Sequence, residues 1–282
     1  MGMEDFDFRM RHPEGDLGTA IESIWFARGT VPYASEQISP TGSTVVVLVL
    51  GDAIRYSIAE GPVVETAEGF VAGPHDRPAT NEPTGETHAV GIVTTATGCA
   101  RLLGRGPRPL RGRVLPLGQA WSRGERLRAE AIACADPDDV LRVLLTELTG
   151  IVPVASERAA RCAGWVARLE AEPTLPIAEL AQAAGLSYGH FVSEFSHHTG
   201  LTPKTLARLV RMRQVIADID IEPTAPWIDI AHRHGWFDQA HFIRDFKRHT
   251  GVSPNTYVER QRRTFLAGQP IAGSGVGFVP DT

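Results

Sequence analysis

The pattern of apolar and polar residues divides the chain into an N-terminal region of short strands and a C-terminal region of helices. Between about Ile21 and Val93, short apolar runs alternate with Gly and Pro turns, a spacing typical of a small barrel or sandwich. The predicted strands are Ile21–Phe26, Ser43–Leu50, Ile54–Ile58, Val63–Val71 and His88–Val93. Because Val45–Leu50 is apolar at every position, we expect this strand to be buried.

Helical spacing first appears in Arg123–Cys134 and Asp136–Leu148, and the chain is helical from Ser156 onward. The second of these helices would have an apolar face, formed by Leu141, Val143, Leu144, Leu145 and Leu148. Such a face needs a partner surface. Either its own barrel or a second copy of the chain would supply one.

One motif occurs twice in the helical region. Pro173-Thr174-Leu175-Pro176-Ile177 matches Pro223-Thr224-Ala225-Pro226-Trp227 at an offset of 50, and Thr199-Gly200-Leu201-Thr202-Pro203 matches Thr250-Gly251-Val252-Ser253-Pro254 at an offset of 51. The sequence therefore contains two copies of one structural unit.

Each copy has the start and stop signals of a helix-turn-helix. A Thr is predicted to cap the first helix, a Gly to end it in the left-handed conformation, and a Ser or Asp to cap the second. Two Phe residues turn one face inward, and a second Gly precedes the cap of the next helix. In chain order these residues are Thr174, Gly185, Ser187, Phe191, Phe195, Gly200 and Thr202, and then Thr224, Gly235, Asp238, Phe242, Phe246, Gly251 and Ser253. A DNA major groove accepts such an exposed second helix.

The run from Gly235 to Tyr257, which contains Asp238-Gln239, His241-Phe242 and Gly251-Val252-Ser253-Pro254, resembles the DNA-binding domain of the AraC/XylS family of transcriptional regulators. The resemblance extends over about Ser156 to Arg263. It implies two helix-turn-helix units joined by a rigid helix, running here from about Pro203 through Ala217. The two second helices would enter successive major grooves about 34 Å apart.

Inward Phe242 and Phe246 place a second set of residues on the outer face of their helix. This face carries Gln239, Ala240, Ile243, Arg244 and Lys247. Arg244 is suited to guanine, Gln239 to adenine or a phosphate, and Ile243 to a thymine methyl. The predicted phosphate contacts are Lys247, Arg248, Arg260, Arg262 and Arg263.

The corresponding face of the first copy has few groups that read bases. It carries Gly189, Val192, Ser193 and Ser196, with Glu194 beside them. We therefore expect weak direct readout there. His190 and His241, which precede the inward Phe of each copy, are expected to make structural contacts near the turn.

The N-terminal region also resembles a known domain, over about residues 14 to 122. The residues that carry this resemblance are Ile24-Trp25, the run from Pro40 to Asp52, Gly73-Pro74-His75 and the run from Ala100 to Gly104. They are similar to the sensor-type, cupin-like domain of one AraC subgroup, which implies a ligand-sensing or dimerising role without identifying a ligand.

Two sets of residues in this region are candidates for a site. His75, Glu86 and His88 are clustered, but they lack the spacing of a cupin metal site, and we interpret them as an accidental cluster. Four aromatic residues either line an apolar pocket or belong to the core: Trp25, Tyr33, Tyr56 and Trp121.

Composition limits the class of protein. The net charge of −5 does not indicate a nonspecific nucleic-acid coat, and eleven basic residues between Glu170 and Arg263 balance eleven acidic ones. An isolated neutral domain releases few counterions on binding DNA, so specific affinity is expected to depend on a dimer.

Cys99, Cys134 and Cys162 lack CxxC spacing, which favours a reduced cytoplasm. The longest apolar run, Val45–Leu50, is too short to span a bilayer, and we expect a soluble, cytoplasmic protein.

The sequence thus predicts an α+β protein: a small β-barrel, cupin-like sensor or dimerisation domain at residues 1–150, a double helix-turn-helix domain at 156–265, and a disordered tail at 266–282. The predicted function is sequence-specific regulation of transcription, with no enzymatic step, metal or cofactor. Its partner would be double-stranded DNA, with RNA polymerase, a small-molecule effector and a second copy as further candidates, and no membrane. The alternatives are a metal-dependent cupin-like enzyme with a DNA-binding appendage and a ligand-free binding module.

Overall fold

Two antiparallel sheets form the N-terminal part of the protein. The computed structural model describes residues 6–31, 33–219, 226–266 and 278–281. In the first sheet the strands lie in the order β1 (Asp7–Arg11), β2 (Ile21–Gly29), β9 (Thr87–Thr94), β4 (Val45–Val49), β7 (Gly69–Ala72) and β10 (Val114–Pro116). In the second the order is β11 (Phe278–Asp281), β3 (Ser35–Ile38), β8 (Ala79–Pro83), β5 (Ile54–Ile58) and β6 (Val64–Thr66).

Strand β4 explains why the run at Val45 lacks polar residues. Successive side chains of a strand point to opposite faces of its sheet. Val46 and Leu48 belong to the core beneath the helices, whereas Val47 and Val49 belong to the core between the two sheets. Both faces of this strand are therefore buried, as the sequence predicted.

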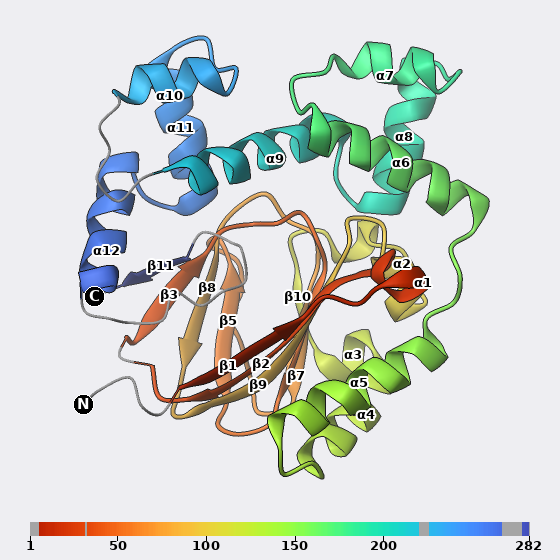
Figure 1. Cartoon of the computed structure of the whole chain (residues 1–282), viewed down its shortest axis with the longest axis vertical. Helices are drawn as coiled ribbons and strands as arrows, with labels where there is room; N and C mark the ends of the chain where they lie inside the picture. The colour runs from red at the N-terminus through yellow and green to blue at the C-terminus, as the bar shows by residue number, and fades with distance from the viewer. Residues whose placement is uncertain (1–5, 32, 220–225, 267–277, 282) are drawn as a thin grey trace.

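Short helices cover the outer face of the first sheet (Figure 1). They are α1 (Gly15–Gly18), α2 (Cys99–Leu103), the 3₁₀ turn η2 (Arg108–Leu110), α3 (Leu117–Ala120), α4 (Ser122–Ile132) and α5 (Pro137–Ile151). Leu141, Leu144 and Leu148 of α5 are buried in the core of this domain. Its own domain therefore covers the apolar face of α5, which was one of the two possibilities left open by the sequence.

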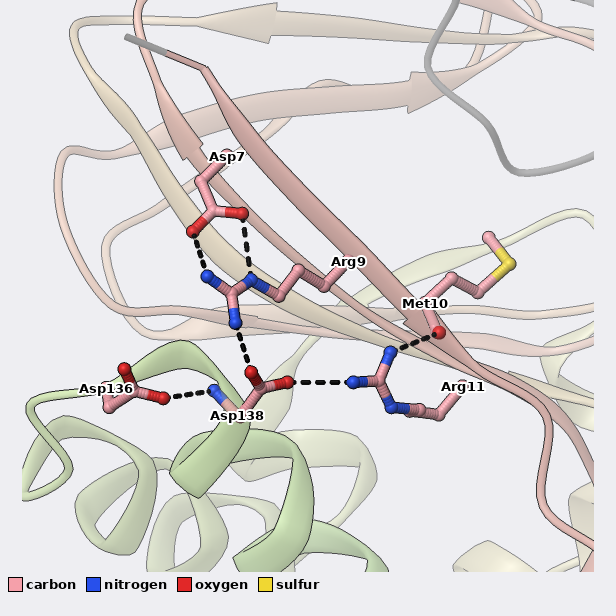
Figure 2. Close-up of polar contacts among 6 residues, drawn as sticks. All are labelled: Asp7, Arg9, Met10, Arg11, Asp136 and Asp138. Carbon is pink, nitrogen blue, oxygen red and sulfur yellow. Dashed lines mark hydrogen bonds and ion pairs between the residues drawn. The ribbon is translucent and has the colours of Figure 1, made fainter.

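Polar contacts fix the start of α5 on strand β1, as Figure 2 shows. Asp136 caps the helix by accepting a hydrogen bond from the amide of Asp138 at 2.8 Å. The carboxylate of Asp138 in turn pairs with Arg9, and with Arg11 at 2.8 Å. The first turn of α5 is thus held by both a cap and two guanidinium groups.

The C-terminal part is helical and contains two similar units. Its helices are α6 (Glu157–Ala171), α7 (Ile177–Ala183), α8 (Tyr188–Thr199), α9 (Pro203–Asp218), α10 (Trp227–Arg233), α11 (Gln239–Thr250) and α12 (Pro254–Leu266). Helix α9 lies between the units (Figure 1). Its Leu206 and Val210 join one core with Phe191 and Phe195, and its Met212 and Val215 join the other. The predicted linker helix is therefore confirmed.

Several sequence predictions require correction. Pro176 and Pro226 stand at the N-caps of α7 and α10, neither of which has a side-chain cap, so Thr174 does not cap α7; Thr224 lies outside the described residues. The predicted strand Val63–Val71 is two strands, β6 and β7. The tail was predicted to be disordered from 266, but Phe278–Asp281 pair with β3; residues 267–277 lie outside the described residues. None of the described helices is long and apolar enough to cross a membrane.

Candidate nucleic-acid interface

The turn between α10 and α11 fixes which face of α11 is outward. Gly235 has a φ of +81°, and the carboxylate of Asp238 caps α11 by accepting from the amide of His241 at 2.7 Å. Phe242 and Phe246 are fully buried, and Trp236 packs edge-on against Phe242 with ring centroids 5.5 Å apart. The predicted left-handed glycine, cap and inward aromatic pair are all confirmed.

The linker helix braces this turn, a feature that the sequence analysis missed. The Arg211 guanidinium lies 4.4 Å from the ring centroid of Trp236 and donates to the carbonyl of Gly235 at 3.1 Å. The indole of Trp236 donates to Asp245 at 3.0 Å. His241 lies 3.3 Å from the same carboxylate, in keeping with the structural role expected of it. The Arg211 guanidinium and the Trp236 indole therefore fix the orientation of α11 relative to α9.

The outward face of α11 holds all but one of the DNA contacts predicted on that helix. Gln239, Ala240, Arg244 and Lys247 are exposed, and Ile243 is half-buried against the core of its unit. Within the described part of the chain, the side chains of Arg244 and Lys247 form no hydrogen bond or ion pair. Two unpaired cations thus lie on the face of a helix that the fold leaves open.

Arg248 lies elsewhere. Its guanidinium donates to Asp76 of the N-terminal domain at 2.7 Å, and Arg208 of α9 donates to the same oxygen at 2.8 Å. Burial alone would raise the pKa of Asp76, but Arg248 and Arg208 hold it below its ordinary value. In this arrangement Arg248 binds the neighbouring domain instead of presenting a free cation, so its predicted phosphate contact would require the two domains to separate.

His249, next in the chain, is buried at the same interface. Burial, together with the nearby Arg213 and Arg208, lowers the pKa of His249 to about 3. Its Nε2 has no hydrogen-bond partner among the described residues. Because the ring is neutral at physiological pH, it contributes packing rather than charge to the domain contact.

Helix α8 has the same local construction but a different surface. Ser187 caps it at His190, Phe191 and Phe195 are buried, and Gly200 ends it with a φ of +76°. His190 lies 3.6 Å from the carboxylate of Glu194, one turn further along. The four predicted contact residues share a hollow with Arg108 and Arg111 of the N-terminal domain: Gly189, Val192, Ser193 and Ser196. The cations of this hollow therefore come from η2 and the loop after it.

The terminal cluster of bases has internal partners. Arg263 pairs with Glu259 at 2.6 Å, one turn earlier on α12. Arg260 and Arg262 also interact with other groups of the chain. Their predicted phosphate contacts remain predictions.

Two exposed aromatic side chains beside the predicted helices were also missed. Phe237, in the turn before α11, is 91% exposed, and Tyr188 at the start of α8 is 57% exposed. Both side chains lie next to the N-cap residue of a helix that is predicted to enter the major groove. Their position directly beside the predicted caps was the available signal.

The candidate metal residues do not form a site. His75 is buried with its Nδ1 2.8 Å from the carbonyl of Gly73, Glu86 pairs with Arg28 at 3.6 Å, and His88 packs edge-on against Phe26. No group of three metal-ligating side chains is assembled among the described residues.

Of the four aromatic residues, three line one cavity between the sheets: Trp25, Tyr33 and Tyr56. The fourth, Trp121, belongs to the core beneath the helices instead.

Two protein families match separate parts of the chain. A family described as "Helix-turn-helix domain" matches residues 180–260, and a family described as "Domain of unknown function (DUF6597)" matches residues 9–116. No curated protein sequence matches this chain.

Among solved structures, ToxT from Vibrio cholerae aligns with a TM-score of 0.46 at 8% identity, over 91% of this chain and 98% of that one. ToxT with an unsaturated fatty acid bound aligns at 0.47 and 9%, over 90% and 95%. The C-terminal domain of AraT, a response regulator from Geobacillus stearothermophilus, aligns at 0.32 and 26%, over 39% and 86%.

Proposed function

We propose that this chain, which belongs to the AraC-type helix-turn-helix regulators through residues 180–260, reads its operator chiefly with α11 and uses α8 mainly for positioning. The observation that carries this proposal is the contrast between the two outward faces. Arg244 and Lys247 are exposed and unpaired on α11, whereas the predicted contact residues of α8 include no cation.

Each residue of α11 has a definite chemical role in this proposal. The planar Arg244 guanidinium donates two parallel hydrogen bonds to O6 and N7 of guanine, and Gln239 is suited to the N6 and N7 of adenine. Lys247 is a point charge one turn beyond Ile243 and is suited to a phosphate. Half-buried Ile243 offers its exposed edge to a thymine methyl.

Selection of bound duplexes from a random library, using the full chain, tests this asymmetry. We expect one strongly specified half-site and a second, weakly specified one about 10 base pairs away. Absence of any enriched sequence would overturn DNA-binding regulation itself. If both half-sites are specified equally strongly, the protein would still be a DNA-binding regulator, but α11 would not be the main source of base readout.

The N-terminal domain is proposed to control this binding through Asp76. His75 lines the cavity between the sheets, and the adjacent Asp76 holds Arg208 and Arg248 of the DNA-binding part. A change in the cavity wall at His75 would therefore act directly on the residue that joins the two parts.

Dimerisation is supported by the charge balance alone, since the apolar face of α5 is covered within its own domain. Sedimentation of the full chain at micromolar concentration, with and without operator DNA, tests it. A monomer under both conditions would mean that a single chain occupies each operator.

A further inference from the structure

A cavity of about 160 Å³ lies between the two sheets of the N-terminal domain. Aromatic side chains form much of its wall: Phe8, Trp25, Tyr33, Tyr56 and Phe70. Trp25 packs flat along β9 because Gly91 has no side chain; a Cβ there would lie 2.0 Å from the indole. A cavity of roughly 150 Å³ is large enough for a benzene ring, which sets the scale of the occupant.

The polar groups of the cavity can accept hydrogen bonds from a ligand. Glu36 is 7% exposed, and its carboxylate accepts from Tyr33 at 2.9 Å and from Asn81 at 2.5 Å. Each carboxylate oxygen can accept a further hydrogen bond. The hydroxyls of Ser39, which is 3% exposed, and Thr87 line the same cavity, and neither has a partner among the described residues. Buried polar groups of this kind are normally hydrogen-bonded, so their lack of partners points to a ligand.

Negative charge lines the cavity, and the carboxylate of Glu36 has no cation beside it among the described residues, whereas Glu22 lies near Arg213. Among the residues that the structure describes, the lining includes Glu36 and Glu22 but neither Lys nor Arg. Burial lowers the pKa of His75, and its Nδ1 contacts the carbonyl of Gly73, so the ring is neutral and offers Nε2 as an acceptor. An anionic ligand would meet an uncompensated carboxylate in an apolar surrounding, which is strongly unfavourable. A cation would meet a carboxylate and aromatic faces, both of which attract it.

We propose that this cavity binds a small primary amine in its ammonium form, carried on a single ring or a short apolar chain, with the ammonium group donating to Glu36. The apolar part of such a ligand occupies the space beside Trp25 and Tyr56. Binding is a property of the N-terminal domain and is measured without DNA, so it can fail or succeed independently of the function proposed above.

The ionisation of Glu36 gives the proposal a signature in pH. Burial raises the pKa of Glu36 to about 7, so near neutral pH part of the empty protein carries a protonated carboxyl group. An ammonium ion favours the ionised form, and its binding therefore releases a proton. Affinity for the amine should rise between pH 6 and pH 8, where its own ammonium remains protonated.

Titration calorimetry of the full chain with benzylamine, and with benzoate and benzyl alcohol as anionic and neutral counterparts, tests the inference at pH 6, 7 and 8. We expect benzylamine to bind most tightly and more tightly at pH 8 than at pH 6, with proton release into the buffer. The inference is overturned if benzoate binds as tightly as benzylamine, or if benzylamine fails to bind at millimolar concentration.

The variant Glu36→Gln keeps the shape of the side chain and should weaken benzylamine binding about tenfold or more, the loss expected for a charge-assisted hydrogen bond. Glu86→Gln makes the same change at an exposed position of the same domain that does not line the cavity, and should bind as the parent does. If Glu36→Gln fails to fold, the pH dependence of the parent and its selectivity over benzoate decide the question alone. Equal affinity in folded Glu36→Gln would overturn the role of Glu36.

Discussion

At the scale of residues, the proposed difference between α11 and α8 depends on single side chains. Arg244→Ala is expected to cost about 1 to 3 kcal/mol in operator binding and to relax one base position, because it would remove the bidentate base contact proposed for this residue. Ser193→Ala, at an exposed position of α8, should cost much less. Lys247→Ala should weaken all sequences alike and reduce the salt slope by about one. Fluorescence anisotropy over a salt series and binding-site selection measure these effects, and equal losses for Arg244→Ala and Ser193→Ala would contradict the asymmetry.

Gly235 allows a test of the backbone conformation in the turn before α11. Its φ of +81° is unfavourable for other residues, and an added Cβ would lie 2.9 Å from Thr174. Gly235→Val should therefore lower the melting temperature. Gly164→Ala is the matched control, since this glycine lies within α6 with nothing near its Cβ position, and there Ala should stabilise by about 0.5 to 1 kcal/mol. An unchanged melting temperature in Gly235→Val would show that the turn is wrongly placed.

Glu36 makes stability depend on pH. Burial raises the pKa of its folded-state carboxyl to about 7, above the unfolded value, so the folded protein holds the proton more tightly between these values. This contribution is fully present below the unfolded pKa and is lost as the pH rises through 7. Relative to the parent, Glu36→Gln should become progressively more stable from pH 5 to pH 8. Urea unfolding of both proteins at several pH values measures this, and a constant difference would show that Glu36 does not titrate as described.

At the scale of elements, the sequence predicted those helix boundaries that depend on residues within one turn of the chain. Asp238 and Gly251 bound α11 as expected, because caps and left-handed glycines act within one turn of chain. Strands β1, β3, β8 and β10 were missed, because they lack long apolar runs and are held by pairing with distant strands. The same limit applies to the site: the periodicity of α11 predicted an exposed Arg244, but only the fold shows that Arg248 meets Asp76, 172 residues away.

Element η2 offers a test of what lies beside α8. Arg108 and Arg111 share a hollow with the predicted contact face of that helix. Cations there would neutralise phosphates and compensate for the weak face of α8. Replacing both Arg108 and Arg111 with alanine should lower operator affinity and make it less dependent on salt. Arg113→Ala, in the same loop but outside the hollow, should have little effect. Tighter binding by the double variant would show instead that this loop obstructs α8.

At the scale of the whole molecule, the contact of Asp76 with Arg208 and Arg248 joins the N-terminal domain to the helical part, and we propose that it couples sensing to DNA binding. It holds one cation of the linker helix and one of α11 against the N-terminal domain. Asp76→Asn removes the charge that holds them with little change in shape. Released Arg248 then becomes available to a phosphate, so operator affinity should rise and the salt slope should steepen by about 0.9, the increment for one phosphate contact.

A double-mutant cycle separates this effect from general loosening of the structure. If Asp76 acts by holding Arg248, Asp76→Asn should lose most of its gain in affinity in an Arg248→Ala background, because no cation remains to be released. Arg248→Ala alone should bind nearly as the parent does, since its guanidinium is already occupied by Asp76. A gain that persists in the double variant would assign it to Arg208 or to separation of the domains. A loss of affinity in Asp76→Asn would mean that the contact aligns α11 for DNA rather than restraining it.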